Sequence, residues 1–147
     1  MSASRIAITM SLLAGLAGAA QASVSGALGK RVGSVQAAAF GGIVAALLLV
    51  GLAVLAGRGA GIADVFRQPA WLMISGVFGA GVVLTLAYAP PRIGTFATVA
   101  LMIAGQLIAG AAIDAFGWLG NERIPVTATR VIGLLLLTAG AALTLRR

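Results

Sequence analysis

The chain has 147 residues, of which 61% are hydrophobic and only 9% are charged. Soluble domains carry about 25% charged residues, so this composition excludes a water-facing surface and predicts an integral membrane protein. The net charge is +7, but the basic residues are scattered between apolar blocks, which excludes nucleic acid as a partner because its binding needs basic residues clustered on one face.

Charged residues divide the chain into apolar blocks that are long enough to form membrane-spanning helices. The first four blocks contain 24, 26, 24 and 21 uncharged residues, and a spanning helix needs about 20 predominantly apolar ones. The fifth block follows Arg130 and contains only 15, so it spans if Arg130 snorkels toward the headgroups. We therefore predict an all-α membrane protein with one domain over 1–147 and five transmembrane helices, over 5–28, 34–57, 69–89, 93–114 and 127–146.

The first predicted helix contains the sequence Ala-Gln-Ala at 20–22, which is similar to a signal-peptide cleavage site because it follows a basic start and an apolar run. The uncharged run nevertheless continues to Lys30, and its 24 residues suffice to cross the membrane. We therefore interpret this segment as a transmembrane helix. A mature chain that begins at Ser23 would contradict this interpretation.

Polar and small residues share one side of the first helix. Gln21 and Ser25 lie four residues apart, hence on one face, and both are candidates for substrate binding. Gly18, Ala22 and Gly26 also recur every fourth residue, and such small residues let membrane helices pack closely. Two interpretations of Gln21 stay open: a hydrogen bond to another helix, or contact with a ligand in a cavity.

The third predicted helix ends at Pro90 and Pro91, which force a tight turn into the fourth. Tyr88, just before this turn, is a candidate cavity-lining residue. Trp71 and Trp118 fall at predicted helix ends, where tryptophan commonly anchors a helix at the membrane interface. We predict that both tryptophans are interfacial anchors.

The fourth predicted helix carries the most chemistry. Thr98, Met102, Gln106, Gly110 and Asp114 recur every four residues and so share one face. Thr98, Met102 and Gln106 are therefore candidates for substrate binding. An acid near the membrane is a candidate functional group, so Asp114 could couple transport to protons or cations. The alternative is a structural carboxylate that pairs with a basic residue near the helix end.

The basic residues do not specify one orientation in the membrane. Lysine and arginine are normally enriched in cytoplasmic loops, but five spans place five basic residues on each side of the membrane. The two sets are Arg5, Arg58, Arg67, Arg123 and Arg130 on one side, and Lys30, Arg31, Arg92, Arg146 and Arg147 on the other. This balance favours a dual topology, with an antiparallel homodimer that reproduces an inverted repeat. The alternative is a coincidental count and a single topology.

Three segments resemble the drug/metabolite transporter superfamily, in particular its short five-span branch. They are AGAAQASVSGALGKRVGS at 17–34, PPRIGTFATVALMIAGQLIAGAAIDAFGWLG at 90–120 and RVIGLLLLTAGAAL at 130–143. The resemblance implies half of a ten-helix transporter, since ten-span members look like two such halves fused in opposite orientation. One departure is Ser25, where this branch commonly has asparagine. The first helix also lacks the glutamate of the related small multidrug resistance transporters.

These observations lead to two hypotheses of different classes. The first is a secondary transporter in the inner membrane of a bacterium, which moves a small organic metabolite, drug-like compound or amphipathic solute by alternating access. The second is a membrane scaffold or assembly subunit that transports nothing. A chain without histidine and cysteine and without a phosphate-binding loop is not expected to be an enzyme, and we expect no cofactor and no metal. The expected partners are membrane lipids, a second copy of the chain and a small-molecule substrate.

Overall fold

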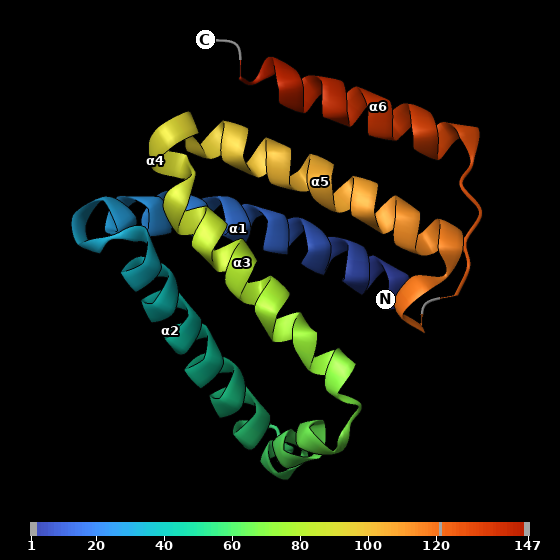
Figure 1. Cartoon of the computed structure of the whole chain (residues 1–147). Helices are drawn as coiled ribbons and strands as arrows, with labels where there is room; N and C mark the ends of the chain where they lie inside the picture. The colour runs from blue at the N-terminus through green and yellow to red at the C-terminus, as the bar shows by residue number, and fades with distance from the viewer. Residues whose placement is uncertain (1–2, 121, 146–147) are drawn as a thin grey trace. The chain divides into compact units, whose positions relative to one another are not determined.

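The computed structural model describes residues 3–120 and 122–145, and 88% of the structure is helical. Five long helices follow one another: α1 (Ala3–Val32), α2 (Ser34–Leu55), α3 (Ile74–Tyr88), α5 (Thr95–Phe116) and α6 (Ala128–Leu143) (Figure 1). Between them lie the single turn α4 (Pro90–Ile93) and the 3-10 helices η1 (Gly59–Arg67), η2 (Ala70–Met73) and η3 (Trp118–Gly120). No strand occurs in this part of the chain. The prediction of an all-helical protein is confirmed.

Three helix ends differ from the prediction by more than two residues. α1 continues to Val32 because Lys30 and Arg31 occupy its last turn, where positive charge is favourable. α3 begins at Ile74 because the four residues before it form the tighter helix η2. α6 has 16 residues and ends at Leu143, and residue 146, the predicted end, lies outside the described residues.

Four segments of the described chain are long and apolar enough to cross a membrane: Ser4–Val32, Ser34–Leu55, Ala70–Ile93 and Thr95–Phe116. They correspond to the first four predicted spans. The fifth prediction is met only by a shorter apolar helix, α6, whose 16 residues extend about 24 Å. This length falls short of a hydrocarbon core of about 30 Å, unless the flanking residues extend it or the bilayer thins locally.

Contacts between residues divide the chain into two units, and the boundary after Ala19 falls within α1. One unit is Ala20–Arg92, and the other combines the segment up to Ala19 with the segment from Ile93 onward. Each unit has its own internal packing. The prediction of a single domain over 1–147 stays a prediction.

In the unit Ala20–Arg92, α2 and α3 run side by side in opposite directions and are joined through η1 and η2 (Figure 1). The last turns of α1 approach the end of α3 closely. A Cβ atom added to Gly26 would lie 2.9 Å from the Pro90 Cβ, and one added to Gly29 would lie 2.6 Å from the Ala87 carbonyl oxygen. Glycine at 29 is therefore required for this backbone approach.

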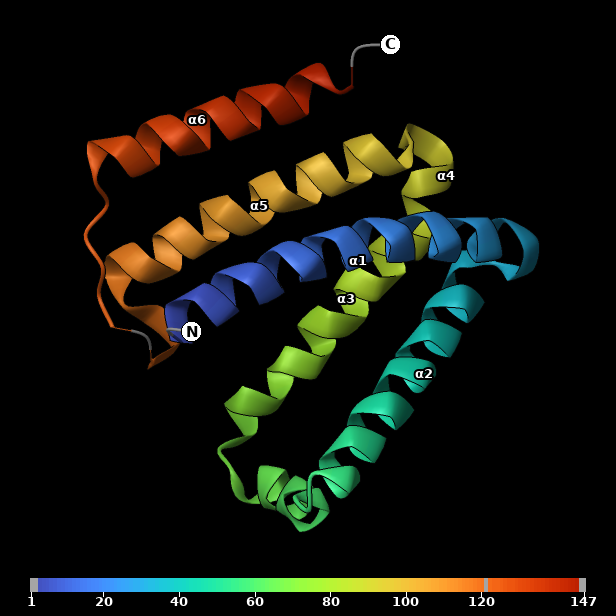
Figure 2. The same ribbon diagram turned by 180° about the vertical axis from the view of Figure 1, so that it is seen from behind.

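In the other unit, α5 packs against α6, and the two helices are antiparallel (Figure 2). α5 begins after Gly94, whose φ of 88° lies in the left-handed region, and it ends at Gly117, whose φ is 65°. These two glycines set sharp limits to the helix, because left-handed backbone is accessible to glycine at little cost. The predicted stop at Pro90 and Pro91 is confirmed, with α4 as the intervening turn.

Large apolar side chains cover the outside of the helices. Leu47 is 67% exposed, Phe96 is 76% exposed and Leu136 is 69% exposed. Such a surface would be strongly unfavourable in water, whereas acyl chains solvate it as well as another helix would. The exposed surface therefore fits helices that face lipid.

A charged cavity between α5 and α6

A cavity of about 310 Å³ lies between α5 and α6, within one unit. We call it the charged cavity, because Asp114 and Arg130 contribute to its wall. The rest of the wall consists of one amide side chain and small or aliphatic residues. The lining residues are Gln106, Leu107, Gly110, Ala111 and Asp114 of α5, and Arg130, Leu134 and Leu137 of α6.

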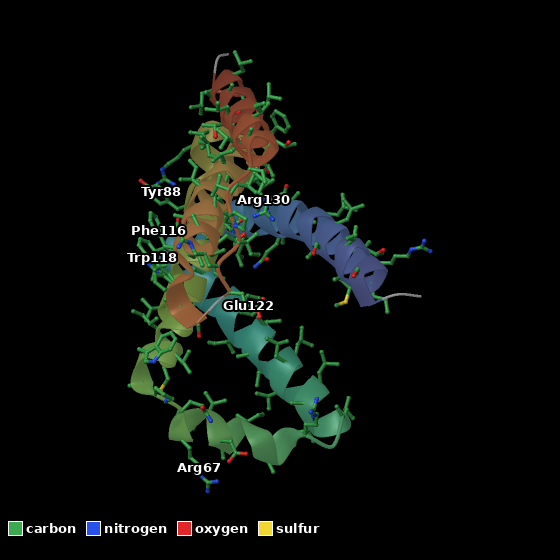
Figure 3. All side chains as sticks on the ribbon, turned by 90° about the vertical axis from the view of Figure 1, so that its right-hand side faces the viewer. Arg67, Tyr88, Phe116, Trp118, Glu122 and Arg130 are labelled. Atoms are coloured by element: carbon green, nitrogen blue, oxygen red, sulfur yellow. The ribbon has the colours of Figure 1, made fainter. Side chains whose placement is uncertain are left out.

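Asp114 and Arg130 form an ion pair across the charged cavity. One guanidinium nitrogen of Arg130 lies 3.4 Å from Oδ2 of Asp114 and donates a hydrogen bond to it. The side chain of Arg130 is 51% exposed and that of Asp114 is 37% exposed, so the pair is open to a solute that enters the cavity. Arg130 is the only described basic residue that pairs with Asp114. Figure 3 labels Arg130 on α6.

The chain between the two helices folds back onto the end of α5 and so places this pair. The backbone N–H of Ile124 donates to the carbonyl oxygen of Asp114 at 2.9 Å, and Nε of Arg123 donates to that of Ala115, also at 2.9 Å. These carbonyls are among the last four of α5, which have no partner within the helix. Thr127 then caps α6 by accepting a hydrogen bond from the N–H of Arg130.

Gln106 lies two turns before Asp114 on the same face of α5. Eight residues separate them, which corresponds to about 12 Å along the helix axis. The side chain is exposed and lines the charged cavity. Within the described part of its unit, no hydrogen bond engages its amide. An amide without an intrahelical or interhelical partner is available to a solute.

A second cavity, of about 290 Å³, lies further along the same pair of helices, and we call it the apolar cavity. Leu137 lines both cavities, so they adjoin at this residue. Among the described residues of its wall, Thr144 is the only one with a polar side chain. The lining residues are Phe96, Ala100, Ile103, Leu136, Leu137, Gly140, Ala141 and Thr144.

The amino-acid sequence matches a known family. Residues 6–143 match the model of a family of drug/metabolite-transporter type described as "Putative inner membrane exporter, YdcZ". The chain belongs to this family. No match was found among curated proteins or among solved structures.

Membership of this exporter family confirms the resemblance that the three sequence segments predicted. Together with the apolar helices, it identifies a multi-pass membrane protein of a transporter family. It also agrees with the expectation that the chain is not an enzyme. Substrate and mechanism do not follow from the family's description.

Two other residues of α5, Thr98 and Met102, are also predicted to bind substrate. Only Thr98 makes a side-chain hydrogen bond within the described chain. Thr98 is 1% exposed, and its hydroxyl donates to the carbonyl oxygen of Gly94 at 2.8 Å. Met102 is partly exposed and does not line the charged cavity. Their role in substrate binding stays a prediction.

Three predicted site residues belong to the other unit, Ala20–Arg92. Gln21 is exposed and Ser25 is partly exposed. Tyr88 is 51% exposed, and the guanidinium of Arg92 lies 3.5 Å above its ring and donates to its backbone carbonyl. A cation–π contact of this kind stabilises the turn after α3. Substrate contact by these three residues stays a prediction.

The predicted packing stripe on α1 differs along its length. Ala22 is fully buried, and Gly26 packs against Pro90. At Gly18 an added Cβ atom would meet no described atom within 4 Å apart from its chain neighbours and the nearby backbone of its own helix. Close packing is therefore seen at the carboxyl-terminal part of the stripe.

Both tryptophans lie at helix ends, as predicted. Trp71 lies in η2 and is 52% exposed, and Trp118 lies in η3 and is 55% exposed. The Trp118 ring stacks on Phe116 with 4.9 Å between ring centres (Figure 3). Anchoring at the interface stays a prediction for both.

Sequence reasoning missed the contribution of α6 to the site. It predicts Arg130 only as a residue that snorkels at a helix end, and it does not single out Leu134 and Leu137. A signal was present, because an acid at a carboxyl-terminal helix end is unfavourable without a cationic partner. Arg130 is a basic residue near the start of the next helix, 16 residues away.

Proposed function

We propose that the protein is a secondary transporter for a small organic solute, and that the charged cavity between α5 and α6 is its binding site. The observation that supports this proposal is a cavity of about 310 Å³ that combines an ion pair with apolar walls. Ligand sites are typically such hollows, mostly apolar with a few placed polar groups, and the smallest measure about 300 Å³. Ionisable side chains are rare in membrane-spanning segments and commonly mark a substrate or ion pathway.

Gln106 and Asp114 have distinct roles in this proposal. The Gln106 amide donates and accepts hydrogen bonds and so orients the solute along α5. Asp114 is the only described acid in the wall of the cavity and is the group proposed to couple transport to protons or cations. Solute and coupling ion would both act on the pair with Arg130.

The working unit in this proposal is an antiparallel homodimer that moves solute by alternating access. Support comes from the equal number of basic residues on the two sides of the membrane. Two copies in opposite orientation form an inverted repeat, the architecture in which transporters hold substrate between two halves. No residue of the chain is assigned to the contact between the copies.

Release from proteoliposomes tests the transport function. Vesicles that contain the purified chain are loaded with three poorly permeant phenyl compounds: benzenesulfonate, phenyltrimethylammonium and phenyl glucoside. We expect faster release of at least one compound than from protein-free vesicles. We further expect both Gln106→Ala and Asp114→Ala to lower that release, because the first removes the amide proposed to orient the solute and the second removes the acid proposed to couple transport.

The control variant for this experiment is Asp64→Ala, which removes an acid from an ion pair in η1 that lines none of the described cavities. It should release solute at the rate of the unchanged protein. Unchanged release in both Gln106→Ala and Asp114→Ala would refute the site. Absence of protein-dependent release for all three compounds would instead favour the scaffold hypothesis.

A topology reporter tests the dual orientation. We expect a carboxyl-terminal fusion to give signal from both sides of the membrane, because the basic residues balance. Adding one lysine to the loop between α2 and η1 should then shift the population toward the orientation that places this loop in the cytoplasm. Signal from a single side, before any lysine is added, would refute the dual topology.

A further inference from the structure

We propose that the solute is an amphipathic organic anion, whose carboxylate or sulfonate binds Arg130 in place of Asp114. The inference names the substrate class of the charged cavity and rests on the proposed transport function. The inference starts from the ion pair of Asp114 and Arg130 across the cavity. The family's description does not mention this pair.

Arg130 has unused capacity to bind an anion. A guanidinium carries five N–H donors in a planar fork that matches two oxygens of a carboxylate or sulfonate. The structure shows one contact from this fork, to Oδ2 of Asp114 at 3.4 Å, which is long for a charge-assisted hydrogen bond. No other side-chain acceptor in residues 3–120 and 122–145 takes a hydrogen bond from it. A solute anion with bidentate geometry would make the stronger contact.

The two members of the pair are not equivalent once they separate. If a cationic solute bound Asp114, Arg130 would be left charged, because a guanidinium does not lose its proton in proteins. If an anionic solute binds Arg130, the group left behind is a carboxyl, which unlike a guanidinium has a neutral form. Leaving a charge without a partner is expensive in a membrane, so the exchange that frees the aspartate is favoured.

The remaining surface fits an apolar body attached to the anionic group. Beyond the ion pair, the wall of the charged cavity contains three leucines and two small residues, with Gln106 as its other polar residue. The leucines and small residues are Leu107, Leu134, Leu137, Gly110 and Ala111. Past Leu137 the apolar cavity continues along the same helices. A solute with one anionic group and an apolar body therefore meets a complementary surface along the contact between α5 and α6.

In the two cavity linings near the end of α5, arginine outnumbers acidic residues. Arg123 lines the neighbouring hollow beside Ala115, so the linings here contain two arginines and one aspartate. Glu122 lines none of the described cavities. The local excess of positive charge attracts an anion toward the pair.

Binding of the three phenyl compounds to the purified full chain tests this inference by calorimetry. We expect benzenesulfonate to bind more tightly than phenyltrimethylammonium or phenyl glucoside. Arg130→Gln should weaken benzenesulfonate binding about tenfold or more, because a charge-assisted bidentate contact is lost. Asp114→Asn should strengthen it about two- to fivefold, because a half-exposed ion pair no longer has to be broken.

The chain offers a matched control, since Asp64 and Arg67 form an ion pair of the same composition at 3.0 Å, outside the described cavities. Asp64→Asn and Arg67→Gln should leave benzenesulfonate binding unchanged (Arg67 is labelled in Figure 3). Thermal unfolding without probe reports whether each variant is folded. Should Arg130→Gln not fold, Arg130→Lys retains the charge but not the fork, and it should bind more weakly than the unchanged protein.

The outcomes separate this inference from the proposed function. Tighter binding of phenyltrimethylammonium, lost in Asp114→Asn, would overturn the anion and leave the transporter and its site in place. Equal binding of benzenesulfonate to all folded variants would also overturn it. Absence of binding together with absence of protein-dependent release would refute the proposed function itself.

Discussion

Replacing Leu137 by tryptophan is expected to reduce solute release by about tenfold or more, the factor that ~1.4 kcal/mol of lost binding produces. Leu137 lines both the charged and the apolar cavity, so a larger side chain at this position takes up space in both cavities. The charged groups are left intact. Release of the phenyl compounds from proteoliposomes measures the effect.

Leu135→Trp is the matched control for this variant. Leu135 lies two residues away on α6, is 64% exposed and lines none of the described cavities. The same change in size should therefore leave release near the rate of the unchanged protein. Equal loss in both variants would contradict a solute path along the contact between α5 and α6, and unchanged release in both would do so as well.

Gly29→Ala is expected to destabilise the protein by about 1–3 kcal/mol, the usual cost of overpacking. The added Cβ atom would lie 2.6 Å from the Ala87 carbonyl oxygen. Because this neighbour is backbone, no side-chain rotation relieves the contact, and α1 must move away from the end of α3. The midpoint of thermal unfolding in detergent measures the change.

Gly15→Ala in the same helix serves as the control for Gly29→Ala. A Cβ atom at Gly15 would meet no described atom within 4 Å beyond its chain neighbours and the nearby backbone of α1, and alanine favours a helix over glycine by about 1 kcal/mol. This variant should keep or raise the midpoint. A Gly29→Ala protein as stable as the Gly15→Ala protein would show that the two helix ends are not held together at this distance.

Much of the fold could be predicted from the sequence because membrane helices need only local information. The length of each uncharged block determines where a membrane-spanning helix can form. Pro90 and Pro91 end the third helix whatever its packing, because proline cannot continue a helix hydrogen-bond pattern. Helix ends were less accurate. The charges of Lys30 and Arg31 predict a boundary before them, although cations are favourable in a last helical turn.

Only the α5 residues of the candidate site could be predicted from the sequence. The four-residue repeat of Gln106, Gly110 and Asp114 identified the face of α5, because periodicity is visible within one helix. Which residues of α6 lie opposite depends on the register between two helices, and no pattern within either sequence sets it. Arg130 became a site residue only when the packing of α6 on α5 was known.

The connection between α1 and α2 consists of one residue, Gly33, whose φ is 99°. A link this short does not let the two helices enter the bilayer one after the other with a long loop between them. Lys30 and Arg31 lie in the last turn of α1, directly before this link. If both helices span the bilayer, these two charges and the start of α2 therefore share one membrane face, and neither can change sides without the other.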